Sequence, residues 1–237
     1  MIYAIGDIHG HPDALKRIID RILDDAGEHG IARPKTVFLG DYVDRGPDSK
    51  GVLDLLSSGD LDEVLAPVYL LGNHEVALLQ VLRGSNPEQW CDEGGFKTMQ
   101  SYLRWRGHLL DPSWHRAFVD TFPKRHMDFL AGLSASHRCG PWLFSHAGVN
   151  PHKPLSEQRT GDYVYGHWPF REWPKPLEGG IRVVHGHWRE RGDRVAVLPH
   201  RIGVDTGCGF SDGHLSAVAL NDDGVGVRVL SDEGGVP

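Results

Sequence analysis

The sequence predicts an α/β protein built as a sandwich of two mixed β-sheets flanked by helices. Two observations support this fold class. Across the first half, apolar β-rich runs alternate with amphipathic helical segments, an order that implies neighbouring parallel strands joined by right-handed crossovers. The last third shows short runs of alternating polarity separated by Gly and Asp turns, which predicts further strands with one face on a core.

The first half predicts three strands and at least two helices. Leu15, Ile18 and Ile22 recur at the spacing of an amphipathic helix, and Pro47 with Asp48 marks the start of another. The apolar runs IYAI, TVFL and VYLL are the expected strands. In chain order we expect a strand at 2–6, a helix at 12–25, a strand at 35–39, a helix at 48–58, a strand at 67–71 and a helix that begins near the GNHE block.

Residues 85–133 break this alternation with tryptophans, prolines and interrupted helical spacing such as FKTMQSYLRW. We expect a helical insertion or cap there, between core elements. At 237 residues the chain is most simply one large domain spanning 1–237. The later strands are expected near 142–145, 181–185, 194–198, 202–205, 215–220 and 225–230.

The composition is that of a globular protein with a substantial core. The hydrophobic fraction is 40%, and the net charge of −7 argues against a nucleic-acid partner, which usually needs a basic stripe. Three cysteines without CxxC spacing predict free thiols in a reducing compartment rather than a disulfide framework. No signal-peptide pattern and no window close to the roughly 18 apolar residues of a membrane span are present, so we expect a cytoplasmic protein without a membrane partner.

Five short blocks place Asp, Asn or His directly after predicted strands. They read GDIHG at 6–10, GDYVDRG at 40–46, GNHE at 72–75, HAG at 146–148 and GHW at 186–188. A single Asp-Gly or His-Gly pair is usually only a turn. Five such blocks in this arrangement instead predict oxygen and imidazole ligands that converge on hard or borderline divalent metals, with glycines that allow a close backbone approach.

The ligand types predict a site for two metal ions. Asp7 and His9 are separated by one residue, which puts both side chains on one side of extended backbone. The carboxylate of Asp41 could bridge two ions about 3.5–4 Å apart, as in two-metal hydrolases of phosphate esters. We assign Asp7, His9 and Asp41 to the first ion, and Asp41, Asn73, His146 and His187 to the second.

Further residues complete the predicted chemistry. Arg45 and Arg171, together with Asn73, are candidates to bind phosphate oxygens, although each arginine could instead pair with a carboxylate at the surface. His74 is placed to protonate a leaving alkoxide, and Asp44 to orient that imidazole and raise its pKa. The nucleophile would be a metal-bridging water or hydroxide that attacks directly and in line, without a phosphoenzyme.

These blocks resemble the motifs of the PPP-type serine/threonine protein phosphatases, within the calcineurin-like metallophosphoesterase superfamily. That family is marked by GDxHG, GDxVDRG, GNHE, a HAG or HGG block and a late His, which here thread through residues 1–187. The resemblance implies a β-sandwich flanked by helices and a site for manganese, iron or zinc, with Mn²⁺ favoured. It also supports the roles given to His74, Asp44, Arg45 and Arg171. The stretch HAGVNPHKPLSEQ looks like the small bacterial members.

Within this resemblance the motifs indicate two substrate classes. Asp44 in the second block and Glu75 after His74 favour the protein phosphatase branch, hence hydrolysis of phosphoserine, phosphothreonine or other phosphomonoesters of a phosphoprotein or a small molecule. GHW at 186–188 resembles the related bacterial diadenosine tetraphosphatases, so the alternative is a dinucleoside polyphosphate hydrolase. A non-catalytic binding module is disfavoured because neither a predicted ligand nor the proton donor is missing.

Some nearby residues have no assigned role. His185 and Asp205 could support a ligand from behind, or could simply pack and turn the chain. Arg189 stands where many metallophosphoesterases have a second histidine. Trp168 and Trp188 could line a substrate cleft, although core or cap packing is the more common role of tryptophan. The oligomeric state is left open.

Overall fold

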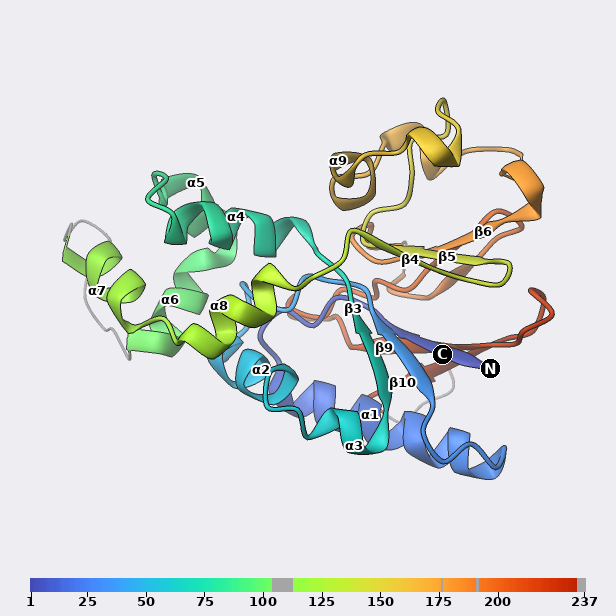
Figure 1. Cartoon of the computed structure of the whole chain (residues 1–237), viewed down its shortest axis with the longest axis horizontal. Coiled ribbons are helices and arrows are strands. Elements are labelled where there is room, and N and C mark those ends of the chain that lie inside the picture. Colours follow the sequence, from blue (N-terminus) through green and yellow to red (C-terminus); the bar gives the residue numbers. More distant parts are fainter. Residues whose placement is uncertain (104–112, 176, 191, 234–237) are drawn as a thin grey trace.

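Two five-stranded sheets stack on one another with helices on their outer sides (Figure 1). The structure is a computed structural model that describes residues 1–103, 113–175, 177–190 and 192–233. The first sheet has the order β10-β9-β1-β2-β3, with β1 (Ile2–Ile5), β2 (Lys35–Phe38), β3 (Ala66–Tyr69), β9 (Ser216–Leu220) and β10 (Val227–Ser231). The second has the order β4-β5-β6-β8-β7, with β4 (Ser136–Cys139), β5 (Trp142–Ser145), β6 (Arg182–His185), β7 (Ala196–Val197) and β8 (Arg201–Gly203). The predicted sandwich of two mixed sheets flanked by helices is confirmed.

Strand β1 lies at the centre of the first sheet and is buried on both faces. Ile2 and Ala4 belong to the core between the sheets, whereas Tyr3 and Ile5 pack with the helices. Strands β1, β2 and β3 run parallel, and β9 pairs antiparallel with β1. The carboxyl ends of the three parallel strands therefore meet at one edge of the sheet, which is where ligand sites form in α/β folds.

The core between the sheets consists of aliphatic and aromatic side chains from both layers. Val37 comes from the first sheet, and Trp142, Phe144 and Val184 come from the second. All four side chains are almost completely buried. Each buried side chain of this size contributes about 1.5–3 kcal/mol, so this layer fixes how the two sheets, and the loops at their ends, face one another.

Four helices follow the strands of the first sheet, and the first begins where its sequence pattern begins. In α1, Leu15, Ile18 and Ile22 are buried, as their spacing predicts. Asp48 caps the next helix, α2, by accepting a hydrogen bond from the backbone N–H of Gly51 at 2.8 Å. The helices are α1 (Pro12–Glu28), α2 (Ser49–Leu56), α3 (Leu61–Val64) and α4 (Asn73–Leu82).

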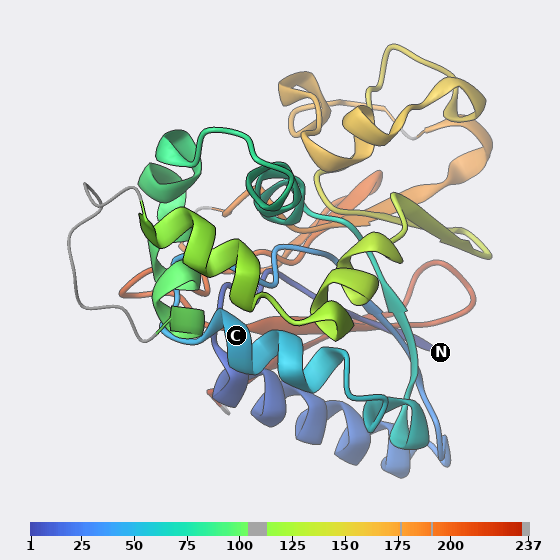
Figure 2. The same ribbon diagram turned by 60° about the vertical axis from the view of Figure 1, so that its left-hand side comes forward.

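The helices of residues 85–133 lie together beside α4 at one end of the molecule (Figures 1 and 2). Their aromatic rings pack against one another. Trp90 stacks on Phe118 with 5.7 Å between ring centroids, and Tyr102 meets Phe118 edge-on at 5.6 Å. The segment contains α5 (Glu88–Trp90), a π-helical turn (Cys91–Gly95), α6 (Phe96–Leu103), α7 (Ser113–Thr121) and α8 (Lys124–Ala131). That the whole chain is one domain stays a prediction.

The connection from β5 to β6 is a second irregular segment, with the short helix α9 and three 3-10 turns. Strand β4, which the sequence did not predict, lies at the sheet edge and pairs antiparallel with β5. Its sequence, SHRC, lacks apolar alternation, so no pattern marks it as a strand. None of the described helices is long and apolar enough to cross a membrane. The elements of the connection are Leu155–Glu157, α9 (Thr160–Val164), Trp168–Phe170 and Glu178–Gly180.

Candidate metal centre

The loops that follow five strands meet at one place and bring all six predicted metal ligands together. The first sheet contributes four of them and the second sheet contributes two. Most are buried, while Asn73 and His187 are half-buried. Asp7 and His9 follow β1, Asp41 follows β2, Asn73 opens α4 after β3, His146 follows β5 and His187 follows β6. Because neighbouring strands run parallel, their carboxyl ends meet at one edge of each sheet, and the loops after them bring these six side chains together.

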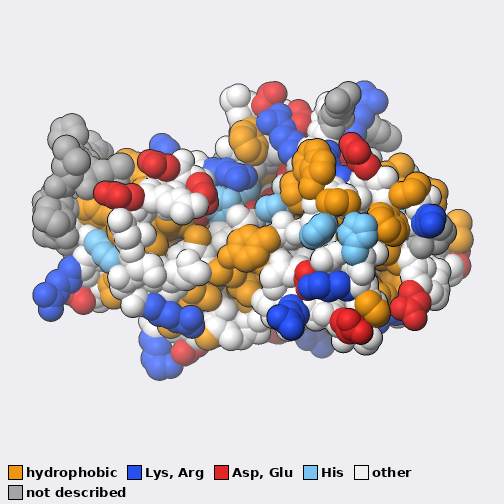
Figure 3. Space-filling view, turned by 90° about the horizontal axis from the view of Figure 1, so that it is seen from above, with side chains coloured by type: hydrophobic (Ala, Val, Ile, Leu, Met, Phe, Trp, Pro, Cys, Tyr) orange, Lys and Arg blue, Asp and Glu red, His pale blue; other side chains and the backbone are white. Residues whose placement is uncertain are grey.

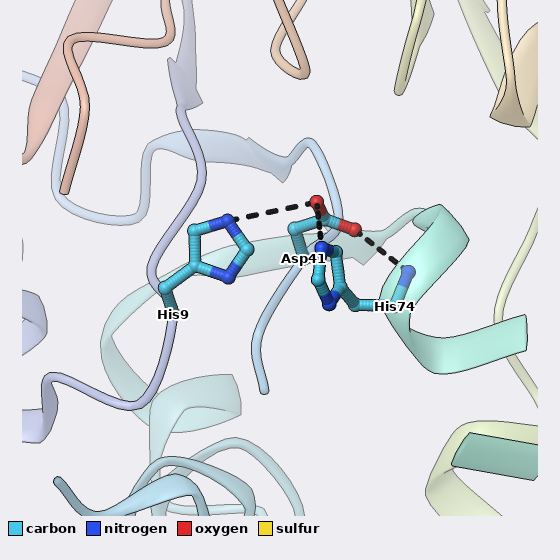
Figure 4. A group of neighbouring side chains, drawn as sticks. All are labelled: His9, Asp41 and His74. Atoms are coloured by element: carbon cyan, nitrogen blue, oxygen red, sulfur yellow. Dashed lines mark hydrogen bonds and ion pairs between the residues drawn. The ribbon is translucent and has the colours of Figure 1, made fainter. Parts of the chain in front are cut away.

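Asp41 lies at the centre of the site, and its two carboxylate oxygens face different neighbours. Oδ2 is 3.7 Å from Nε2 of His9 and 3.8 Å from Nε2 of His74 (Figure 4), whereas Oδ1 is 3.3 Å from Nε2 of His146. Two groups result in which one donor atom per residue lies within 4.8 Å of the others: His9, Asp41 and His74 form one, and Asp41, His146 and His187 form the other. A carboxylate shared by two groups is what a bridging ligand requires.

Asn73 and Asp7 complete the two groups. Oδ1 of Asn73 is 3.0 Å from Nε2 of His146 and 2.9 Å from Nδ1 of His187. Both oxygens of Asp7 accept from the backbone N–H of His187 at 3.1 Å, and Oδ2 of Asp7 is 4.0 Å from Nε2 of His9. Asp7 therefore lies beside His9, and Asn73 lies beside His146 and His187, while the role of these residues as metal ligands stays a prediction.

Backbone carbonyl groups orient two of the imidazoles. Nδ1 of His9 donates to the carbonyl oxygen of Val43 at 2.8 Å, and Nδ1 of His146 donates to that of Leu39 at 2.9 Å. In a neutral ring, this bond leaves the lone pair on Nε2, the atom that faces Asp41. A second hydrogen bond of this kind is typical of histidines that bind metals.

The site concentrates negative charge away from water. Burial raises the pKa of Asp7, and the nearby carboxylates of Asp205 and Asp41 raise it further. Burial alone would lower the pKa of His146, but Asp41, Asp7 and Glu75 raise it to about 10. Divalent cations would supply the positive charge that these carboxylates favour. A donor set of carboxylate, amide and imidazole groups therefore fits manganese, iron or zinc.

The backbone of the site is held in an unusual conformation. Five of the six non-glycine residues with positive φ in the described part of the chain are predicted site residues: His9, Asp41, Asp44, Arg45 and His187. Such conformations cost on the order of 1–3 kcal/mol each and persist where the surroundings fix them. Glycines make the close packing possible, because a Cβ on Gly72 would collide with the carboxylate of Asp41 and a Cβ on Gly186 with that of Asp7.

A buried histidine–aspartate pair lies beside the predicted ligands. Nδ1 of His74 is 2.7 Å from Oδ2 of Asp44. The same oxygen accepts from the indole Nε1 of Trp90 at 2.9 Å, and Oδ1 accepts from the hydroxyl of Thr98 at 2.6 Å. Burial alone would lower the pKa of His74, but Asp41 and Asp44 raise it to about 9. The imidazole therefore tends to hold a proton, as a general acid requires.

The two candidate phosphate-binding arginines are placed differently. Nη1 of Arg45 is 2.6 Å from Nε2 of His9, and Nη2 is 3.1 Å from Nε2 of His74, so this guanidinium lies within the site. Arg171 instead donates to Oε2 of Glu190 at 3.2 Å. The predicted phosphate-binding role stays a prediction for both, and the position of Arg45 supports it more directly.

Glu75 has a structural role that the sequence reasoning missed. Its Oε2 accepts from the backbone N–H groups of Gly72 at 3.0 Å and Asp41 at 2.8 Å. Its Oε1 accepts from those of Tyr42 at 2.8 Å and Val43 at 3.3 Å. One buried carboxylate thus fixes the loop after β2 against the start of α4. The GNHE block contained the signal, because an acidic residue in the first helical turn is a capping position.

His185 and Asp205, whose roles were left open, support the surroundings of the site. Nε2 of His185 is 3.2 Å from Nη1 of Arg201, and burial followed by this positive charge lowers the pKa of His185 to about 3. Asp205 accepts from the backbone N–H of Gly207 at 2.9 Å, which is the turn role that the sequence allowed.

Comparison with known proteins identifies the family. Residues 1–230 match the family model of the calcineurin-like phosphoesterases. The symmetrical bis(5′-nucleosyl)-tetraphosphatase of Dechloromonas aromatica is 26% identical over 269 residues, which cover 93% of this chain and 92% of that protein. The corresponding protein of Coxiella burnetii is 25% identical, with coverage of 88% and 84%. The asymmetrical bis(5′-nucleosyl)-tetraphosphatase PrpE of Oceanobacillus iheyensis is 27% identical, with coverage of 88% and 84%.

Solved structures share the fold. The crystal structure of a protein proposed to be a diadenosine tetraphosphatase matches with a TM-score of 0.62 and 22% identity, over 99% of this chain and 94% of that chain. A cold-active protein-tyrosine phosphatase of a psychrophilic Shewanella matches with a TM-score of 0.57 and 15% identity, over 97% and 80%. The three sequence relatives carry the activity of the alternative rather than that of the protein phosphatase branch. The chain belongs to the calcineurin-like phosphoesterase family.

Proposed function

We propose that this protein hydrolyses dinucleoside polyphosphates such as diadenosine tetraphosphate, with two divalent cations held by the six predicted ligands. The observation that carries the proposal is the position of Asp41, whose two oxygens face two separate ligand groups. Cations bound there would neutralise phosphate charge and lower the pKa of the water molecule that attacks phosphorus. Mn²⁺ is the expected metal, with iron or zinc as the other candidates.

The side chains of the site would bind the substrate and move its protons. Arg45 presents two guanidinium nitrogens to the centre of the site, where they would bind phosphate oxygens as a fork. Asn73 and Arg171 are proposed to add further contacts. His74 is held through Nδ1 by Asp44, so its Nε2 would donate a proton to the leaving oxygen.

The proposed substrate class rests on the relatives and on one motif. Three relatives at 25–27% identity are named bis(5′-nucleosyl)-tetraphosphatases, two symmetrical and one asymmetrical. The GHW block at 186–188 resembles the same group. A small nucleotide partner also agrees with the net charge of −7, which disfavours a nucleic acid. A cytoplasmic location would give the protein access to such nucleotides.

A second candidate function is hydrolysis of phosphomonoesters, including phosphoserine and phosphothreonine. One observation favours it, namely the 2.7 Å bond between Asp44 and Nδ1 of His74. An alkoxide leaving group is strongly basic and needs a proton in the transition state. A nucleoside diphosphate is a much weaker base, so a reinforced proton donor is of less use in its departure.

Parallel initial rates test the choice. Purified protein with Mn²⁺ is given diadenosine tetraphosphate, a phosphothreonine peptide and p-nitrophenyl phosphate, and the products are identified by chromatography. We expect nucleotide release to dominate, with ADP as the only product for symmetrical cleavage and AMP with ATP for asymmetrical cleavage. Faster phosphate release from the peptide would replace the proposal by the second candidate. Loss of all three activities in Asp41→Asn excludes a contaminating phosphatase.

A further inference from the structure

A small cavity opens beside the metal centre, between the helical insertion and the β5–β6 connection. It has a volume of about 160 Å³ and is lined by residues of α4, of α5 and its flanking turns, and by Tyr165, which directly follows α9. Figure 1 shows α4 and α5 facing α9 across the upper side of the molecule. Figure 3 looks onto that side and shows acidic, basic, hydrophobic and histidine side chains exposed near one another.

Two residues connect this cavity to the catalytic machinery. Asn73 lines the cavity and also lies 2.9 Å from His187 and 3.0 Å from His146. Trp90 lines it and donates its indole N–H to Asp44. If the phosphate groups of a substrate bind at the predicted metals, this cavity lies directly next to them. It could then bind the part of the substrate that is attached to the phosphates.

The chemistry of the cavity wall does not suit another phosphate. Neither Lys nor Arg is among the described residues that line it, and Glu93 adds a negative charge. The wall instead carries the side-chain amides of Gln80, Asn86 and Gln89, which are donors and acceptors without charge. The Asn86 amide is bonded to Glu88, whereas Gln89 spends one N–H on Glu93 at 3.0 Å and keeps its second N–H and its oxygen for a ligand. Its volume is well below the roughly 300–1,000 Å³ of a site for a whole drug-sized ligand, so it would take one uncharged fragment of a larger substrate.

Tyr165 adds the feature that selects the kind of fragment. Tyr165 is 53% exposed and is one of the few large hydrophobic residues exposed in the described part of the chain. An exposed aromatic ring beside neutral amides is the combination that recognises nucleobases, because the ring stacks on the base and the amides bond to its edge. An aliphatic or sugar fragment would use the amides but would gain little from a flat ring.

We propose that this cavity is a nucleobase subsite in which Tyr165 stacks on the base and the amides of Gln80 and Gln89 bond to its edge. The inference rests on the proposed function, since it places one base of a dinucleoside polyphosphate next to phosphates bound at the metal centre. It goes further by assigning substrate selection to the helical insertion and to the residue after α9.

Tyr165→Leu tests the stacking role, with Tyr165→Phe as the conservative control. Loss of one base–aromatic stack corresponds to a factor of about 5–150 in affinity. We expect Tyr165→Leu to raise KM for diadenosine tetraphosphate by that factor with little change in kcat, and Tyr165→Phe to stay close to the wild type. Inorganic tetraphosphate, which has no base, should inhibit all three proteins equally. Val225→Ala, which trims a 76% exposed side chain in the β9–β10 turn, is the control for surface truncation.

Two results would overturn the subsite. One is an unchanged KM in Tyr165→Leu, and the other is an equal loss of affinity for inorganic tetraphosphate. If the wild type does not cleave diadenosine tetraphosphate at all, the proposed function fails, but the subsite is still tested by inhibition of glycerol phosphate hydrolysis. AMP should then inhibit more strongly than ribose 5-phosphate, and Tyr165→Leu should remove the difference. If AMP and ribose 5-phosphate inhibit the wild type equally, the nucleobase subsite is refuted, independently of the outcome for the proposed function.

Discussion

Replacement of Asp44 by Asn isolates the charge that supports His74. The carboxylate receives the imidazole Nδ1 and the indole of Trp90 on one oxygen and the hydroxyl of Thr98 on the other. An asparagine of nearly the same size keeps an acceptor for His74 if its NH₂ group faces Thr98, whose hydroxyl oxygen can accept. The ring orientation would then be retained while the negative charge is lost, and the pKa of His74 should fall.

The size of the effect follows from the type of bond that is lost. A hydrogen bond to a charged partner contributes about 1.5–3 kcal/mol to the state that it stabilises. If His74 protonates the leaving oxygen, Asp44→Asn should lower kcat for an alkyl phosphomonoester by about 10- to 150-fold. Hydrolysis of p-nitrophenyl phosphate should change little, because p-nitrophenolate leaves without a proton.

The measurement is the ratio of kcat values for glycerol phosphate and p-nitrophenyl phosphate in the wild type and in Asp44→Asn. Trp90→Phe is the matched control, because it removes the second donor to the same oxygen but keeps the charge. It should alter both substrates equally. An equal loss on both substrates in Asp44→Asn would refute the proton-donor role and leave Asp44 as a residue that only positions the site.

Three further outcomes are expected. Asp41→Asn should lower kcat/KM for every substrate by roughly a thousand-fold, as loss of metal-ion stabilisation is worth several kcal/mol, and metal analysis should show fewer bound ions per chain. In Glu75→Gln, an NH₂ group would face backbone N–H donors that need an acceptor. The free energy of unfolding, measured by thermal denaturation, should therefore fall by roughly 3 kcal/mol. His200 is buried against the carbonyl of Phe170, and burial lowers its pKa. Below about pH 6.5 the unfolded chain therefore binds more protons than the folded chain. As the pH falls through this range, the free energy of unfolding should decrease by up to about 1.4 kcal/mol per pH unit. His200→Asn should make that slope less steep without removing it, because burial also lowers the pKa of His185. An unchanged slope would show that His200 does not contribute.

The positions of the candidate metal ligands could largely be predicted because local sequence and strand order determine them. Asp7 and His9 follow a strand that is buried on both faces, and Asp41 follows its parallel neighbour. Parallel pairing brings those two positions to one edge whatever the rest of the chain does. The same reasoning reaches His146 and His187, since β5 and β6 are also parallel neighbours.

Other parts of the site depend on contacts that leave no local pattern. Trp90 and Thr98 reach Asp44 from 46 and 54 residues away through the helical insertion, and no motif in their sequence neighbourhood points to that contact. Strand β4 forms because β5 offers it an edge, and its own polar residues carry no strand signal. The cavity beside Asn73 joins α4 to Tyr165, whose position follows from the way the β5–β6 connection folds back.

The left-handed backbone at the site has a consequence for how this protein would change under selection. Five residues at about 1 kcal/mol each amount to a large part of the roughly 5–15 kcal/mol by which a domain of this kind is stable. Glycine relieves such strain, so a population selected only for heat resistance should accumulate glycine at positions such as Asp44 and His187. Activity would disappear from that population before the fold does. The strained loops would then persist in nature only where hydrolysis itself is under selection.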